Sequence, residues 1–307
     1  MKDKSKNQRK VVKTGISTLT VSLPSKWARA HNIKNGQLIN VETSKGKLVF
    51  SLGDITHEPI ELNFSDEEEW YVGKILRHLY VAGYDEVVIK YKNPAILSKI
   101  RKNLEILAGL EVVESTSSEC KIRNVLQTID SDYDKTVEKA MRLLSSQLDH
   151  FIEDCENGSL DMKEEVNELH LTFARLCNVC RRLISKKSLY DSIHSRYASE
   201  FFNSLIEISL LIKYCYYELE TKKNIKLSDD ELKLLTKIRD FYKSFISSYH
   251  DKDIVLVREV LEERQKMFDD VLKLLNGKNP VLVHYFLMMV RNLTPIANHI
   301  TMNQVMR

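Results

Sequence analysis

The sequence predicts a multidomain α+β fold in which a small β module, a short α/β region and a long helical region follow one another. Apolar residues recur with a period near two at the N-terminus and with a helical period over the second half of the chain. The 307 residues include only nine glycines and five prolines, which argues against a loop-rich or barrel fold. We therefore expect a flexible basic arm at 1–8, a β module at 9–52, an α/β linking domain at 58–128 and a helical domain at 130–307.

The β module is predicted from strands, turns and one short helix. Val11 and Val12 lead into a Thr14-Gly15 turn, and residues 19–23 alternate apolar and hydroxyl side chains, as a half-buried strand does. Pro24 begins a short helix over 25–31, and strands are expected at 38–42 and 48–50. So small a module, with about 45 residues, buries too little apolar surface to be stable alone. We therefore expect it to form a homodimer.

The linking domain alternates strands and helices. Strands are expected at 59–64, 86–91, 110–114 and 120–126, and helices at 65–82 and 94–108. Ser65 and Glu68 have the spacing of a capping box, and Gly83 suits the C-terminal end of the same helix. This order of elements predicts a small α/β domain.

The helical domain shows helical periodicity almost throughout. Six helices are expected at about 131–156, 162–187, 190–222, 228–249, 252–276 and 279–303. Connections this short make neighbouring helices antiparallel, and six helices can form two three-helix units in tandem. Pro295, inside the last helix, predicts a kink.

Charge is distributed unevenly along the chain. Residues 1–50 carry eleven lysines and arginines against Asp3 and Glu42, a net charge of +9, so the remaining residues carry −6 of the overall +3. A basic N-terminal module on an acidic body is typical of a polyanion-binding protein.

The sequence contains no apolar run of about 18 residues, so we expect no membrane-spanning helix. The N-terminus lacks the features of a signal peptide, and the five scattered cysteines suggest reduced thiols, so we expect a cytoplasmic location.

The N-terminal module contains a series of short motifs in a fixed order: Arg9–Gly15, Ser17, Val21-Ser22-Leu23-Pro24, Lys26-Trp27-Ala28 and Asn35-Gly36. In these motifs the module resembles, over about 45 residues, the AbrB/SpoVT family of swapped-hairpin DNA-binding domains. The resemblance implies a dimer whose interleaved hairpins place basic residues against the major groove of double-stranded DNA. Carried over by position, the expected DNA contacts are Arg9, Lys10, Lys13, Ser17, Lys26 and Arg29.

Two segments of the linking domain, Leu79–Asp85 and Leu107–Glu114, precede the long helical part of the chain. In these segments, and in the pattern and domain order of the helical part, the chain resembles archaeal proteins that join such a module to a PhoU-like helical domain. The resemblance implies tandem three-helix units and a role in the control of phosphate uptake.

PhoU domains often bind metal clusters through carboxylates spaced four residues apart on facing helices. In the corresponding stretches here, Asn167 and Thr294 stand where an aspartate would be expected. Glu165, Glu168 and His170 remain as weak candidates for a metal site, and a solvated acidic helix face is the favoured interpretation. We expect no cofactor.

Two further features have ordinary structural interpretations. Cys177 and Cys180 form a single CxxC pair within an expected helix, where a buried stripe is more common than a zinc or redox site. Trp27 is expected to fill the core of the dimeric module rather than to stack on a base. The sequence contains no P-loop, no G-x-G-x-x-G, no H-E-x-x-H and no nucleophile elbow. We therefore expect that the protein is not an enzyme.

Two functions remain open from the sequence. The first is a dimeric transcriptional regulator linked to phosphate uptake, in which the helical domain senses a ligand or partner. The second is a PhoU-like adaptor that binds a phosphate transporter or sensor protein and uses its N-terminal module mainly to dimerise.

Overall fold

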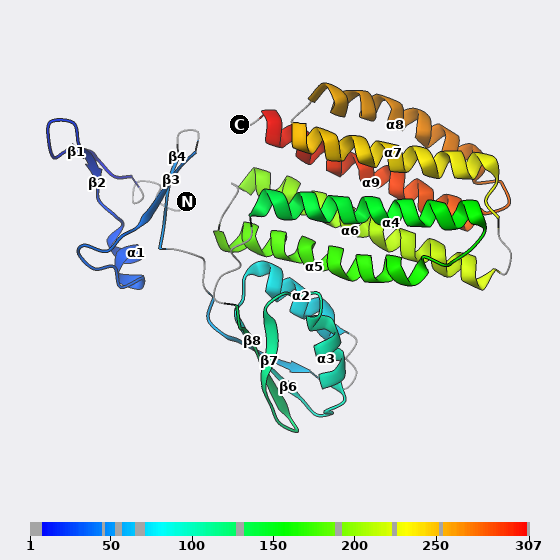
Figure 1. Cartoon of the computed structure of the whole chain (residues 1–307). Coiled ribbons are helices and arrows are strands. Elements are labelled where there is room, and N and C mark those ends of the chain that lie inside the picture. The colour runs from blue at the N-terminus through cyan, green and yellow to red at the C-terminus, as the bar shows by residue number, and fades with distance from the viewer. Residues whose placement is uncertain are drawn as a thin grey trace, which may run out of the picture. The chain divides into compact units, whose positions relative to one another are not determined.

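The computed structural model describes residues 8–44, 47–52, 57–64, 71–126, 132–187, 192–222, 226–251 and 254–305. The chain is mixed α+β and mostly helical, with small sheets towards the N-terminus and a helical C-terminal region (Figure 1). Its contacts divide it into two compact units, residues 1–54 and 55–307. The α/β region and the helical region therefore belong to one unit. The capping box expected at Ser65 and Glu68 lies outside the described residues.

The N-terminal unit consists of two hairpins and a short helix. Strands β1 (Val11–Lys13) and β2 (Leu19–Val21) pair antiparallel, helix α1 spans Ser25–Ala30, and strands β3 (Asn40–Ser44) and β4 (Lys47–Ser51) form the second antiparallel pair. Gly36 has a φ of 81°, which suits the turn expected at Asn35-Gly36. β3 begins later than expected, so Leu38 precedes the strand and is 94% exposed.

The α/β region contains a four-stranded sheet in the order β5-β6-β8-β7. Its strands are β5 (Ile60–Phe64), β6 (Glu86–Tyr91), β7 (Leu110–Ser115) and β8 (Glu119–Asn124). β5 and β6 are parallel because helix α2 (Val72–Ala82) crosses between them, while β8 pairs antiparallel with both β6 and β7. Helix α3 spans Ile96–Leu104, shorter than expected.

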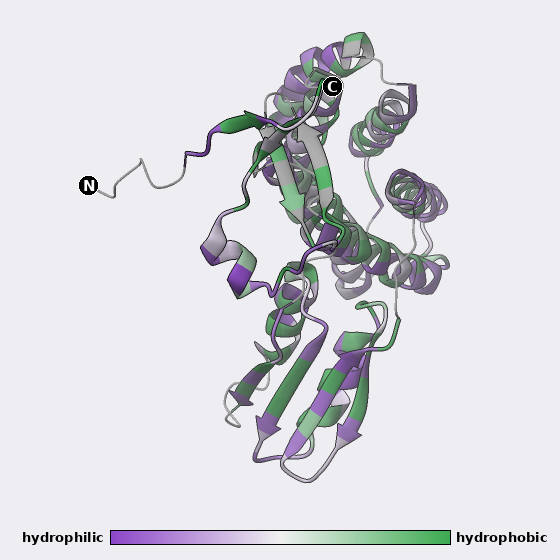
Figure 2. Cartoon of the chain, turned by 90° about the vertical axis from the view of Figure 1, so that its left-hand side faces the viewer, coloured by the Kyte–Doolittle hydropathy of each residue, from purple (hydrophilic) through white to green (hydrophobic). Residues whose placement is uncertain are grey.

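One face of this sheet is buried and the other is open. Burial alternates along β6, and hydrophilic and hydrophobic residues alternate on its strands (Figure 2). α2 and α3 lie behind the sheet in that view and form a core with it, which includes Leu76, Ile89 and Ile122. Gly83 ends α2 in the left-handed conformation, as expected, with a φ of 101°.

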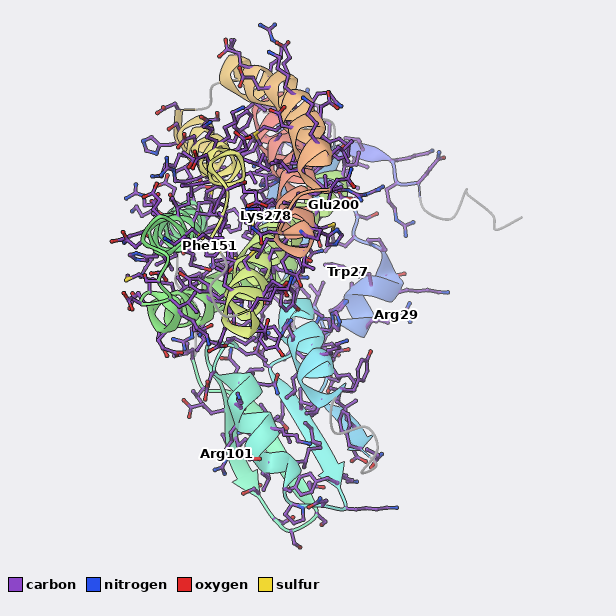
Figure 3. The ribbon with its side chains drawn as sticks, turned by 90° about the vertical axis from the view of Figure 1, so that its right-hand side faces the viewer. Trp27, Arg29, Arg101, Phe151, Glu200 and Lys278 are labelled. Atoms are coloured by element: carbon purple, nitrogen blue, oxygen red, sulfur yellow. The ribbon has the colours of Figure 1, made fainter. Side chains whose placement is uncertain are left out.

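The helical region contains α4 (Tyr133–Asn157), α5 (Lys163–Lys187), α6 (Ser192–Thr221), α7 (Asp229–Asp251), α8 (Ile254–Leu274) and α9 (Pro280–Val305). α4, α5 and α6 contact one another, and so do α7, α8 and α9. The two sets meet where α4 contacts α7 and where α6 contacts α9. One continuous apolar core contains residues from all of these helices, Phe151 among them (Figure 3). α9 continues as a helix through Pro295.

Candidate nucleic-acid interface

The residues expected to contact DNA are all on the surface of the N-terminal unit. Arg9, Lys10, Lys13, Ser17, Lys26 and Arg29 are exposed. The first two precede β1, Lys13 ends it, and Ser17 lies in the turn that leads to β2, while Lys26 and Arg29 are on α1. Among the described residues, none of the five cations forms an ion pair. Their charges are therefore available for an external anion, such as a phosphate of nucleic acid.

The described part of the N-terminal unit has no core of its own. No described side chain of residues 8–52 is buried. Directly paired residues lie on the same face of a hairpin, so Val11 with Val21, and Val41 with Phe50, form apolar faces. These four side chains are 40–60% exposed. An apolar set of this kind is stable in water only when another surface covers it.

Trp27 is the largest apolar side chain of α1 (Figure 3). It is half-buried, and its ring lies 5.3 Å from that of His31, tilted by 57°. This contact is local to the helix. The expected role of Trp27 in the core of a dimer stays a prediction.

The three candidate metal ligands on α5 are not brought together. Glu165 and Glu168 are exposed, whereas His170 is buried. Across the described residues, no group of three or more histidine, cysteine, aspartate or glutamate side chains is arranged to hold a metal ion. His170 has a structural partner instead, because its Nδ1 lies 2.7 Å from the Ser209 hydroxyl.

His170 belongs to a buried polar chain between α4, α5 and α6. Ser209 donates a hydrogen bond of 2.5 Å to Oε1 of the buried Gln147, so its oxygen accepts from Nδ1–H of a neutral His170. Burial, with the positive charges of Lys213 and Arg77, lowers the pKa of His170 to about 4. A neutral imidazole is therefore the form that this part of the core accepts.

The α/β region is joined to α5 by a cluster that the sequence did not predict, which we call the Asp85 junction. Arg182, only 1% exposed, donates to the carbonyls of Tyr80 (2.7 Å) and Tyr84 (2.9 Å) and to the Asp85 carboxylate. Lys186 also donates to Asp85. Burial opposes ionisation of Asp85, but hydrogen bonds from Lys186 and Asn124 and the charge of Arg182 outweigh it, so the pKa of Asp85 is lowered.

A signal for this junction exists in the sequence. Arg182 follows Val179 by three residues and Asn178 by four, so the three side chains share one face of α5, and all three are buried. A charged residue on the buried side of a helix requires a partner from another element. The same side holds Asn178, which donates to the carbonyl of Ile106 at 3.1 Å.

The cysteines have no disulfide and little reactivity. All five are free, and Cys177 and Cys180 are buried within α5. Burial raises the pKa of Cys180 to about 12 and raises that of Cys177 well above its ordinary value. A thiol that does not ionise at neutral pH is a poor nucleophile and a poor metal ligand.

No helix in the described parts of the chain is both long enough and apolar enough to cross a membrane. Comparison with protein-family models, curated proteins and solved structures found no match to this chain.

Proposed function

We propose that this protein is a dimeric transcriptional regulator whose N-terminal unit binds double-stranded DNA in the cytoplasm. The observation that carries the proposal is a net charge of +9 over residues 1–50 in a unit without a buried side chain among its described residues. A second copy covers the apolar hairpin faces and doubles the number of exposed cations. A two-fold dimer then presents two equivalent surfaces to two half-sites, whose spacing the dimer sets.

The proposed dimer exchanges hairpins between the two copies, as the resemblance to AbrB/SpoVT domains implies. Arg9, Lys10, Lys13, Ser17, Lys26 and Arg29 are its proposed DNA contacts. Lysines and arginines contact phosphates and position the protein, while hydroxyl and guanidinium groups also read base edges. Sequence preference would come from the second kind of contact.

The helical region is proposed to be PhoU-like, with α4–α6 and α7–α9 as two three-helix units. Support comes from the mutual contacts within each set, and from the contacts between first helices α4 and α7 and between third helices α6 and α9. This region would receive a ligand or partner. The Asp85 junction fixes α5 to the α/β region, so a change in the helices would be passed towards the DNA-binding unit.

DNA binding is tested by its salt dependence. The full-length protein is titrated into labelled DNA, selected from fragments of its source genome, at several salt concentrations. The affinity should fall steeply as salt rises, because phosphate contacts release counterions. Lys13→Ala should reduce the slope of log affinity against log salt by roughly one for each chain of the dimer.

Lys34→Ala is the matched control, since Lys34 is an exposed lysine of the same unit outside the proposed contact set. An equal loss of slope in both variants would show general electrostatic attraction instead of the proposed contacts. Retention of every genomic fragment to the same degree would remove sequence-specific regulation from the proposal.

An adaptor function is favoured by one observation on the helical region. Tyr214 and Tyr217 are 49% and 67% exposed on α6, and the Tyr214 ring lies 6.0 Å from that of Tyr285 on α9. Exposed aromatic side chains are enriched at protein–protein interfaces. Recovery of transporter or sensor subunits with the full chain, lost in Tyr214→Ser/Tyr217→Ser and without specific DNA binding, would support this function over the regulator.

The link to phosphate rests on the family resemblance. It predicts that the selected DNA sites lie beside genes for phosphate transport. It also predicts that operator affinity responds to phosphate supply or to a partner protein. Operator affinity that stays constant under all such conditions would exclude coupling between the helical region and the DNA-binding unit.

A further inference from the structure

The loop between α2 and β6 is held by α5 through the Asp85 junction. Arg182 donates to the Tyr84 carbonyl at 2.9 Å, and Lys186 donates to the Asp85 carboxylate. Arg182 is almost completely buried, so a bond that it loses is not replaced by one to water. A movement of this part of α5 must therefore displace the loop or break these bonds.

The same loop is contacted by His57, which lies in the segment before β5. The His57 ring is stacked on that of Tyr84, with centroids 4.4 Å apart and planes 14° from parallel. Its Nε2 lies 2.9 Å from the carbonyl oxygen of Ala82, the last residue of α2. A carbonyl only accepts, so Nε2–H donates to a group that has no intrahelical partner at the end of a helix. We call these two contacts the His57 clasp.

The His57 clasp and the Asp85 junction meet at Gly83. A Cβ added at this glycine would lie 3.0 Å from Cγ of Lys186 and 3.6 Å from Nε2 of His57. The aliphatic part of Lys186 and the ring of His57 therefore approach the same short stretch of backbone. A displacement of this stretch by α5 would also move the surface on which the His57 ring is stacked.

His57 lies where the chain enters the larger unit. The N-terminal unit ends at Asp54, three residues before His57, and β5 begins three residues after it, at Ile60. His57 is half-buried, whereas Glu58 and Pro59 are exposed. Among residues 57–59, the histidine is therefore the one that attaches the chain to the loop before the sheet begins.

We infer that the His57 clasp passes a displacement of α5 to the point where the chain leaves the larger unit for the N-terminal unit. His57 is a positioning residue, because it acts through the loop that α5 holds. Control of operator affinity by this route rests on the proposed function, since it requires the N-terminal unit to bind DNA. The contacts of the clasp and their dependence on α5 do not require DNA.

The stacked ring is tested by NMR on the full-length protein labelled with ¹³C-histidine, at about pH 8, above the ordinary pKa of histidine. His57→Gln identifies the Cε1–H signal of His57 by its loss. This signal should lie upfield of that of the exposed His284, because the Tyr84 ring shields it. Tyr84→Leu should return it to the ordinary position, whereas Tyr84→Phe, which keeps a ring, should leave it upfield. An ordinary position in the native protein would overturn the clasp.

Thermal unfolding tests whether the clasp depends on α5. Lys186→Met and Tyr84→Leu should each lower the Tm, and the double variant should lose less than the sum of the two losses, because both side chains act on one loop. Lys163→Met is the matched control, since it removes a paired lysine at the other end of α5, where the partner is Glu220. Its loss should add to that of Tyr84→Leu. Equal additivity for Lys186→Met would overturn the inference.

The control of DNA binding is tested with the same variants on a selected operator. Lys186→Met should change the operator affinity by about twofold or more, and it should have no such effect in the Tyr84→Leu background. Lys163→Met should leave the affinity unchanged. An equal change in both backgrounds, or no change in either, would overturn the inference while the proposed function stands. If no operator is bound, the proposed function fails, and the NMR and Tm results decide whether α5 acts on the clasp.

Discussion

The two units of this chain differ in whether their apolar side chains are buried. Residues 55–307 bury an extensive core, with large side chains such as Phe151 and Phe286 fully covered. Residues 8–52 bury none of their described side chains, although Val11, Val41 and other strand residues alternate as in a packed sheet. The same alternation in the sequence therefore accompanies a buried core in one unit and exposed apolar faces in the other. These exposed faces are the surface that the proposed dimer would cover.

The two units also differ in how they use charge. In the larger unit, Glu86 pairs with Lys121 at 2.8 Å and with Arg123 at 3.0 Å across the sheet. In the N-terminal unit the exposed cations have no such partners among the described residues. Paired charges make a surface soluble, whereas unpaired cations of one sign attract an anion.

The largest expected effect comes from a charge placed on the apolar face of the second hairpin. Val41→Asp should prevent dimerisation, because the carboxylate would be buried opposite Phe50 and its copy. The larger unit should stay folded. Loss of two-site binding should weaken operator binding by about two orders of magnitude or more. Light scattering measures the mass, and fluorescence anisotropy measures the DNA affinity.

Asn35→Asp supplies the control for this variant. It adds the same charge to the same unit, at an exposed position in the turn before β3. The mass should remain that of a dimer, and DNA affinity should fall only by the effect of one added charge. A Val41→Asp protein that remains dimeric would place the interface elsewhere and contradict the proposed arrangement.

The next largest effect concerns the Asp85 junction, which joins the α/β region to α5 within the larger unit. Asp85→Asn keeps the shape of the side chain but leaves Arg182 buried without its counter-charge. The free energy of unfolding should fall by about 3 kcal/mol, at the lower end of what breaking a buried pair costs, because Asp85 is one-third exposed. Urea titration measures the change. Asp149→Asn, which breaks a surface pair with Lys243, should cost less than about 1 kcal/mol.

The helices and strands were largely predictable because their signals are local. The helix predicted over 162–187 is observed as Lys163–Lys187, and Gly83 ends α2 as its position suggested. Errors occurred where propensity is weak. Leu38 was expected within a strand, but the strand begins at Asn40, and the helix expected from Pro94 to Ala108 is only Ile96–Leu104. These differences affect ends of elements and not their order.

The sites of the larger unit were less predictable because they depend on which helices meet. Arg182 and Asp85 are 97 residues apart, and only the packing of α5 on the α/β region joins them. The same packing separates Glu165 and Glu168, which are exposed, from His170, which is buried. A spacing on one helix shows that side chains are near each other, but it does not say which neighbouring helix covers them. The DNA-contact residues are different, because their proposal needs only exposure and charge.

A smaller effect is the pH dependence of stability that the buried His170 gives to the larger unit. The pKa of His170 is lowered to about 4, so the unfolded chain, with a histidine pKa near 6.5, binds a proton before the folded chain does. The stability is fully present above pH 6.5 and is lost progressively as the pH falls towards 4. His170→Asn should remove about 2 kcal/mol of the loss in unfolding free energy between pH 7 and pH 5.

Urea titrations at the two pH values give this difference. His284→Asn is the control, since His284 is exposed on α9, and it should leave the pH dependence as it is in the native protein. His299, whose pKa burial lowers to about 3, should maintain some acid sensitivity in both variants. An unchanged pH dependence in His170→Asn would contradict a neutral, buried His170.

The smallest effect concerns a helix start that the pattern Ser228-x-x-Glu231 could have predicted. The Glu231 side chain accepts from the Ser228 backbone at 2.7 Å, and the Ser228 hydroxyl accepts from the Glu231 backbone at 3.3 Å, so the pair forms a capping box for α7. Glu231 also accepts from Asn279 at 2.9 Å, which ties the start of α7 to the start of α9. Ser228→Ala should therefore lower the free energy of unfolding by about 1 kcal/mol, while dimerisation and DNA affinity stay unchanged. Ser228→Asp, which restores an acceptor, should recover most of the loss, and a failure to recover it would show that the serine acts through contacts other than the cap.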